Sequence, residues 1–103
     1  MARFDVYQNP DAAERKTVPY FLDFQNTFLE IGTRVVIPLY VEKQFINTVR
    51  NLEASLMVQG HTVIMNTSAL GSIPIADLRR PVANIAAQQS LVQNALDTLF
   101  GGY

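Results

Sequence analysis

The chain has no cysteine and no tryptophan, and only one histidine, His61, among its 103 residues. The lack of cysteine excludes disulfides, thiolate metal sites and a cysteine nucleophile. His61 falls in a predicted turn, where an exposed histidine without a chemical role is a better interpretation than a general base. No G-x-S-x-G motif, metal-ligand spacing or glycine-rich phosphate loop accompanies it. The sequence therefore favours a protein that acts by contact, without catalytic residues, metal or cofactor.

Charged residues are scarce and nearly balanced, with eight Lys+Arg, nine Asp+Glu and a net charge of −1. This balance excludes the strongly basic surface expected of a dedicated nucleic-acid binder. The longest uncharged apolar run, Val35 to Val41, contains Pro38 and is far shorter than the roughly 20 residues of a membrane helix. No apolar signal segment opens the chain. We therefore expect a soluble, cytoplasmic protein with one domain over residues 1–103.

The first part of the chain has the period-two alternation of short strands. Strands are predicted at 4–7, 20–25, 34–39, 56–58, 62–66 and 71–75, with a hairpin turn at Gln59-Gly60-His61. Between them, Gln8 to Thr17 is predicted to be an exposed loop, and Val41 to Ala54 is either a helix or a loop.

Two residues in these strands require an explanation. Asp23 interrupts an apolar strand, so it is either exposed on the outer face or buried and hydrogen-bonded to a neighbouring strand. Pro38 cannot donate to a strand ladder, so it is expected at a strand end, at an edge or at a bulge.

The C-terminal segment, Pro81 to Phe100, is predicted to be one long helix that ends at Gly101. Its apolar residues have helical spacing, and Pro81 suits the first turn. Asp97 is its only ionisable residue. The outer face therefore consists of Gln, Asn, Ser and Ala, a charge depletion that favours contact with another protein chain over a merely solvated face. The residues together predict an α+β or barrel-like domain capped by a helix.

Several segments in combination resemble the CcdB family, the toxins of CcdA–CcdB toxin–antitoxin pairs. They are Phe4-x-Val6-Tyr7, F-L-D-F-Q-N at 21–26, R-V-V-I-P-L at 34–39, S-I-P-I at 72–75 and L-F-G-G-Y at 99–103. The resemblance implies a mainly β, SH3-like small barrel with a C-terminal helix, a fold shared with MazF-type ribonuclease toxins. It also implies a homodimer in which the charge-poor helix lies near the dimer axis.

The resemblance implies a function without catalysis. Such a toxin binds the A subunit of DNA gyrase, traps the gyrase–DNA cleavage complex and is neutralised by a CcdA-like antitoxin. Matching the family's gyrase-contacting residues to this chain gives Phe28, Leu29, Asp97, Phe100, Gly101, Gly102 and Tyr103. Gly101 stands where the family has a tryptophan, and one hypothesis is that Tyr103 supplies the missing aromatic surface.

Three alternatives stay open at this point. The chain could be a CcdB-fold homologue that binds an antitoxin but no longer poisons gyrase. It could be a MazF-like endoribonuclease, with Arg34, Arg79 and Arg80 contributing to a basic groove. It could also be a structural dimerisation module without a toxin role.

Overall fold

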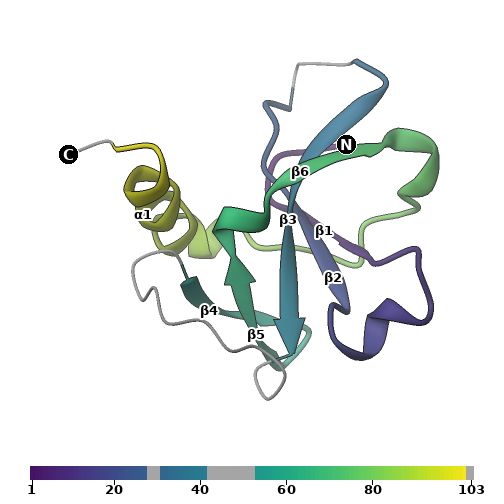
Figure 1. Cartoon of the computed structure of the whole chain (residues 1–103), viewed down its shortest axis with the longest axis horizontal. Coiled ribbons are helices and arrows are strands. Elements are labelled where there is room, and N and C mark those ends of the chain that lie inside the picture. Colours follow the sequence, from purple (N-terminus) through teal and green to yellow (C-terminus); the bar gives the residue numbers. More distant parts are fainter. Residues whose placement is uncertain (28–30, 42–52, 102–103) are drawn as a thin grey trace.

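The computed structural model describes residues 1–27, 31–41 and 53–101, and within them the chain forms a curled antiparallel sheet, a half-barrel, with a C-terminal helix (Figure 1). The strands are β1 (Asp5–Gln8), β2 (Tyr20–Asp23), β3 (Thr33–Val41), β4 (Glu53–Val58), β5 (His61–Asn66), β6 (Gly71–Pro74) and β7 (Ala83–Asn84). The helix is α1 (Gln89–Leu99), and short 3₁₀ turns are η1 (Glu14–Lys16), η4 (Thr67–Ala69), η5 (Ile75–Asp77) and η6 (Ala86–Gln88). The strand order is β4-β5-β3-β2-β1-β7, and β6 also pairs with β3. This architecture agrees with the small barrel and C-terminal helix expected from the sequence.

The long strand β3 organises the sheet, because β2 lies along one side of it while β6 and β5 share the other. The pairing with β6 ends at Val36 and the pairing with β5 begins at Leu39. Pro38 lies between these two pairings, inside β3, so the prediction that it lies at a strand end, an edge or a bulge was wrong. The physical reason for that prediction, that proline has no N–H to donate, still explains its place. Alternation of the ladder with β2 turns the Pro38 nitrogen toward the gap between β6 and β5, where no donor is needed.

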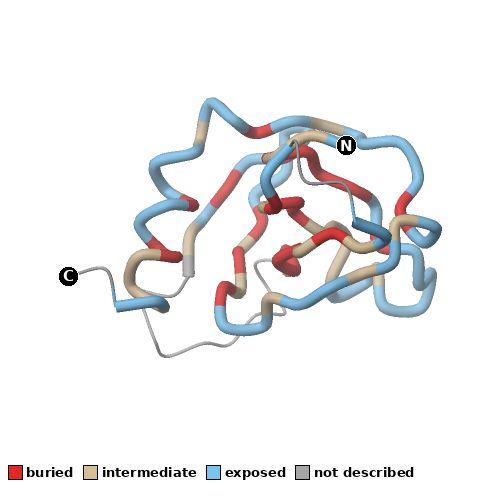
Figure 2. Tube along the Cα trace, turned by 90° about the horizontal axis from the view of Figure 1, so that it is seen from above, coloured by how far each residue is buried: buried red, intermediate tan, exposed pale blue. Residues whose placement is uncertain are grey.

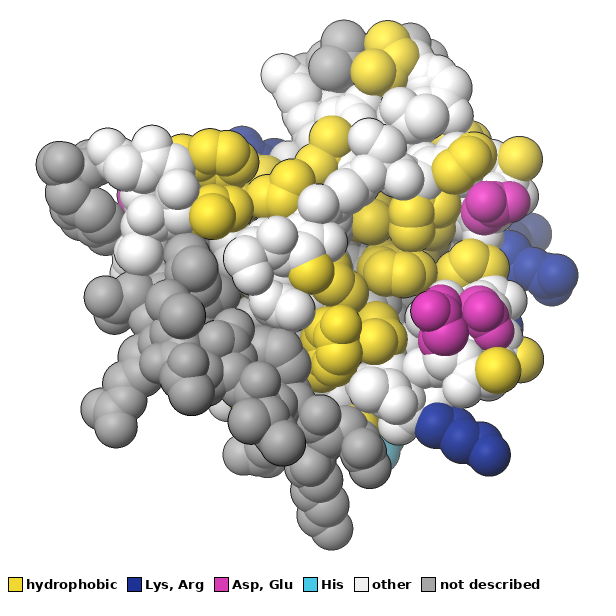
Figure 3. Space-filling view, viewed as in Figure 1, with side chains coloured by type: hydrophobic (Ala, Val, Ile, Leu, Met, Phe, Trp, Pro, Cys, Tyr) yellow, Lys and Arg dark blue, Asp and Glu magenta, His cyan; other side chains and the backbone are white. Residues whose placement is uncertain are grey.

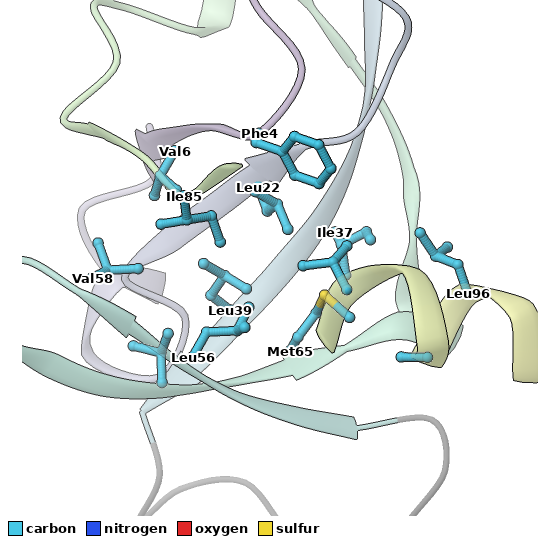
Figure 4. Close-up of a cluster of buried hydrophobic side chains, with 13 residues drawn as sticks. Phe4, Val6, Leu22, Ile37, Leu39, Leu56, Val58, Met65, Ile85 and Leu96 are labelled. Atoms are coloured by element: carbon cyan, nitrogen blue, oxygen red, sulfur yellow. The ribbon is translucent and has the colours of Figure 1, made fainter. Parts of the chain in front are cut away.

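The alternation predicted for the second strand is confirmed by two apolar clusters on opposite faces of the sheet. Leu22 belongs to the main core, with Tyr20 and Phe24 packed against it, whereas Phe21 packs against a second, smaller cluster. The smaller cluster consists of Tyr7, Val36 and Leu78. The main core lies between the concave side of the sheet and α1, and its labelled side chains converge there (Figure 4). Buried positions consequently follow the strands through the interior and one side of α1 (Figure 2).

The predicted hairpin is confirmed as β4 and β5, joined by the two residues Gln59 and Gly60. Both have a left-handed backbone, with φ of 51° and 81°. A two-residue hairpin turn of this kind matches the right-handed twist of the flanking strands. His61 is exposed and is the first residue of β5 rather than a turn residue.

The helix predicted over Pro81–Phe100 is correct only in its second half, because α1 begins at Gln89. The preceding residues instead form β7, which pairs with β1, and the turn η6. Oδ1 of Asn84 accepts a hydrogen bond from the Ala86 N–H at 3.0 Å. Such a local bond from a side chain to the backbone competes with helix formation. Pro81 therefore precedes β7 and is not in the first helical turn.

The loop predicted over Gln8 to Thr17 is largely exposed, but Asn9 is buried. Its amide donates to the Val18 carbonyl at 2.9 Å and its Oδ1 accepts from the Asp11 N–H at 3.0 Å, so it ties the loop to its own base. The ambiguous stretch falls almost entirely in 42–52, outside the described residues. No helix in the described part of the chain is long and apolar enough to cross a membrane.

Candidate functional site: a partner-binding face beside the C-terminal helix

A buried ion pair joins β2 to β3. The Asp23 carboxylate accepts from Nε of Arg34 at 2.7 Å and from Nη2 at 2.9 Å, and the residues are 0% and 1% exposed. This bidentate geometry is the strongest form of the arginine–carboxylate interaction. It decides between the two interpretations of Asp23, which is buried and bonded to the neighbouring strand. Because two charges are costly to bury, the pair contributes to a defined geometry more than to net stability.

The ion pair also fixes the backbone that leaves β2. Nη2 of Arg34 donates to the Gln25 carbonyl at 3.0 Å, and the Asp23 carboxylate accepts from the Gln25 N–H at 3.0 Å. The Gln25 side chain in turn accepts from the Val35 N–H at 2.9 Å. Side-chain bonds thus continue the β2–β3 pairing beyond the end of β2, through the residues that lead toward Phe28 in the sequence.

Tyr7 lies beside this network, with its hydroxyl near the Asp5 carboxylate. The pKa of Tyr7 is raised to about 12, first by burial and then by the negative charges of Asp5 and Asp23, which the Arg34 charge partly opposes. The phenol therefore stays neutral and acts as a structural donor rather than as an acid or base.

An apolar pocket of about 350 Å³ opens between the end of α1 and the sheet. Its floor is apolar because Val35 and Ile37 of β3 and Leu96 of α1 face it. Asp97 and Phe100 stand at its helical side. It is lined by Phe24, Gln25, Val35, Ile37, Leu70, Gln93, Leu96, Asp97 and Phe100. In the space-filling view, apolar side chains gather between α1 and the strands, while most visible charges lie toward the opposite, right-hand end (Figure 3).

Phe100 is the most exposed large apolar residue of the described chain, at 71%. Its N–H donates to the Leu96 carbonyl at 2.9 Å, which closes the last turn of α1. Gly101 follows with φ of +69°, a left-handed conformation that ends helices and that glycine adopts without strain. The predicted helix stop is thus confirmed, and it leaves the Phe100 ring unburied beside the pocket.

The structure brings together only part of the site expected from the resemblance. Asp97 and Phe100 line one pocket, and Gly101 follows Phe100 in the chain without lining it. Phe28, Leu29, Gly102 and Tyr103 lie outside the described residues. The neighbouring Phe24 and Gln25 do reach the pocket from the sheet side.

Sequence reasoning did not select Phe24, Leu70 or Gln93 as site residues, although all three line the pocket. The inward alternation of Phe24 with Leu22 was a usable signal. Leu70 and Gln93 reach the pocket only because η4, directly before Leu70, contacts both β3 and α1, which no local pattern encodes.

Arg34 is not available to the basic groove of the ribonuclease interpretation, because it is buried and paired with Asp23. Arg79 and Arg80 are exposed, and neither lines the pocket. Among the described residues, no group of three or more His, Cys, Asp and Glu side chains could hold a metal. The arrangement offers apolar surface, amides and one carboxylate, which are groups that bind a protein surface.

Fold and site together define a small half-barrel protein with a helix-edge face suited to contact with a partner. A comparison with protein families identifies it further: the family described as CcdB protein matches residues 3–102. The chain therefore belongs to the CcdB family, the toxins of toxin–antitoxin systems. A comparison with curated proteins gives no match.

Proposed function

We propose that this protein binds the A subunit of DNA gyrase, traps the gyrase–DNA cleavage complex and is released from gyrase by a CcdA-like antitoxin. The observation that carries the proposal is the exposed Phe100 ring at an apolar pocket on the C-terminal helix. Family membership names the target, and this face supplies the kind of anchor that an interface needs. A few buried aromatic residues commonly contribute most of the binding energy of an interface.

The mechanism is stabilisation of one state of gyrase by binding. The toxin makes and breaks no covalent bond in this scheme. It binds the cleaved state more tightly than the resealed state, and it shifts the population toward cleavage by that difference in affinity. A fixed backbone at Gln25, held by the Asp23–Arg34 pair, keeps one wall of the pocket preformed. Preorganisation of this kind reduces the entropy lost on binding.

We further propose that the active form is a homodimer. The support is the start of α1 and the turn before it, where Leu91 of α1 and Ala86 and Ala87 of η6 are exposed and no charged residue occurs between residues 86 and 96. Depletion of charge is characteristic of interface cores. A symmetric dimer would place two copies of the Phe100 face on one molecule.

Gly101 occupies the family's tryptophan position, so the aromatic contact has to come from other residues. Phe100 supplies one ring, and we propose that Tyr103 supplies a second. Deletion of Tyr103 is expected to weaken gyrase binding, and unchanged binding would show that Phe100 acts without it.

The test is a cleavage assay with purified protein, gyrase, ATP and supercoiled plasmid, scored for linear DNA after denaturation. The wild-type protein is expected to produce linear DNA. Phe100→Ala is expected to reduce binding by about thirtyfold, the loss of roughly 2 kcal/mol typical of an aromatic anchor. Met57→Ala is the control, because Met57 is also an exposed apolar residue but lies on β4 and does not line the pocket.

If the wild-type protein is folded but produces no linear DNA, gyrase poisoning is contradicted. Equal loss in Phe100→Ala and Met57→Ala would contradict the assignment of the face. Addition of an antitoxin peptide after complex formation is expected to restore religation. Persistence of the linear DNA would contradict the antitoxin part of the proposal.

A further inference from the structure

The guanidinium of Arg3 has no hydrogen-bonding or ionic partner in the described part of the chain. Its guanidinium carbon lies 4.1 Å from the centre of the Phe24 ring and 5.2 Å from the centre of the Phe4 ring. The two rings meet edge to face, at 5.7 Å and 82°. Nε of Arg3 is buried with no hydrogen-bond partner. Contact with both rings therefore fixes the position of the guanidinium, while its Nε forms no hydrogen bond.

The backbone around Arg3 is fixed at considerable cost. Phe4 has φ of 73°, a left-handed conformation that is strained for an aromatic residue. The turn is held from both sides: the Arg3 N–H donates to Oγ1 of Thr27 at 3.0 Å, and the Phe4 N–H donates to the Asp23 carbonyl at 2.7 Å. The turn places the Phe4 ring in the core and the Arg3 side chain outside it, over Phe24.

A second hollow, of about 340 Å³, lies between this turn and α1. It is lined by Arg3, Phe4, Gln89, Ser90, Gln93 and Asn94, so Arg3 is the one charged group among neutral amides and a hydroxyl. The hollow adjoins the apolar pocket, since Gln93 lines both and Phe24 of the pocket wall carries the Arg3 stack. A positioned cation and an apolar cavity therefore belong to one continuous face.

We propose that Arg3 is a specificity-determining residue of this face and binds a side-chain carboxylate of the gyrase A subunit. The inference rests on the proposed function and adds a polar contact to it. A guanidinium is itself planar, and it matches a carboxylate through two parallel hydrogen bonds. A nucleic-acid phosphate is the poorer match, because no second Lys or Arg lines either hollow and the net charge is −1. The target would then present an acidic side chain next to an apolar one that enters the pocket by Phe100.

The test compares Arg3→Met with Arg80→Met in binding to the isolated gyrase A subunit without DNA. Methionine retains an unbranched apolar stem against the two rings while it removes the charge. Arg80→Met removes the same charge from an exposed position that lines neither hollow. Arg3→Met is expected to bind about tenfold more weakly at low salt, and high salt should reduce the difference. Arg80→Met should bind like the wild type, and Arg3→Lys should fall between, because an ammonium cannot form the planar pair.

Each possible result of this comparison either supports or overturns the inference about Arg3. Equal affinities of wild type and Arg3→Met at low salt would overturn the inference while leaving gyrase binding intact. A loss that is the same at every salt concentration would assign Arg3 a packing role and would also overturn it. A loss seen only when DNA is added would identify a phosphate contact instead. Absence of wild-type binding to the subunit would contradict the proposed function itself, and the Arg3 contact with it.

Discussion

Two arginines show how differently one fold uses the same side chain. Arg34 is buried, and Asp23 and a backbone carbonyl satisfy its donors inside the molecule. Arg3 lies on two aromatic rings at the surface, and the described chain supplies no carboxylate for it. In the first arrangement the charge is neutralised inside the protein and helps to define the fold. In the second, contacts with the rings position the charge at the surface, where a partner can bind it. The contrast teaches that a preformed but unsatisfied group is the better indicator of a partner.

The largest effect is expected from disrupting the buried ion pair of Arg34. Arg34→Met leaves the Asp23 carboxylate buried without its cation, and we expect a loss of about 3–5 kcal/mol in the free energy of unfolding. Urea denaturation followed by circular dichroism measures it. The double variant Arg34→Met with Asp23→Leu should recover much of the loss, because both charges are then gone. A single-variant loss below about 1 kcal/mol would show that water or a rearrangement compensates Asp23.

A second pair of substitutions separates the two faces of α1. Leu96 is 4% exposed and belongs to the core, whereas Leu91 on the same helix is 46% exposed. At protein concentrations too low for the proposed dimer, Leu96→Ala should cost about 3 kcal/mol through lost burial and a residual cavity, and Leu91→Ala at most about 0.5 kcal/mol. The same denaturation measurement applies to both. Similar losses would mean that Leu91 is also buried in the protein in solution, as in a dimer through α1.

Local patterns predicted the faces of the strands better than their partners. Alternation placed Leu22 and Phe21 on opposite sides of β2, and the structure confirms it. The same alternation could not tell whether Asp23 is exposed or buried. Its partner Arg34 lies eleven residues away on β3, and only the antiparallel register brings them together. A residue's face is a local property, whereas its partner depends on register.

The start of α1 and the candidate site also depend on contacts between distant residues, which local patterns do not predict. The alanine-rich stretch before Gln89 has good helix propensity, but pairing of β7 with β1 and the Asn84 side-chain bond override it. For the site, the resemblance selected Asp97 and Phe100, which do share a pocket. The resemblance did not select Arg3, because the significance of Arg3 comes from the rings beneath its side chain and the hollow beside it.

A third prediction concerns the buried hydroxyl of Tyr7. Its pKa is raised from 10.0 to about 12 in the folded protein, mainly by burial. The neutral form is favoured in the native state, so this contribution to stability is fully present below pH 10 and is lost as the pH rises toward 12. A shift of this size corresponds to about 2–3 kcal/mol. Denaturation from pH 9 to pH 11.5 measures it, and Tyr7→Phe should show a shallower decline. Parallel curves for both proteins would contradict the assignment.

The smallest expected effect concerns the end of α1. A side chain at Gly101 would meet no atom within 4 Å, so space does not limit substitution there, but the backbone φ of +69° does. Gly101→Ala should therefore cost about 1 kcal/mol from left-handed strain alone. Gly71→Ala is the matched control, since its added Cβ also meets nothing within 4 Å and its backbone is not left-handed. It should change stability by less than about 0.5 kcal/mol. Equal costs would mean that the chain after Phe100 relaxes freely. A cost specific to Gly101 would mean that any side chain there opposes the helix stop that exposes Phe100, which would support the proposed recognition through Phe100 and Arg3.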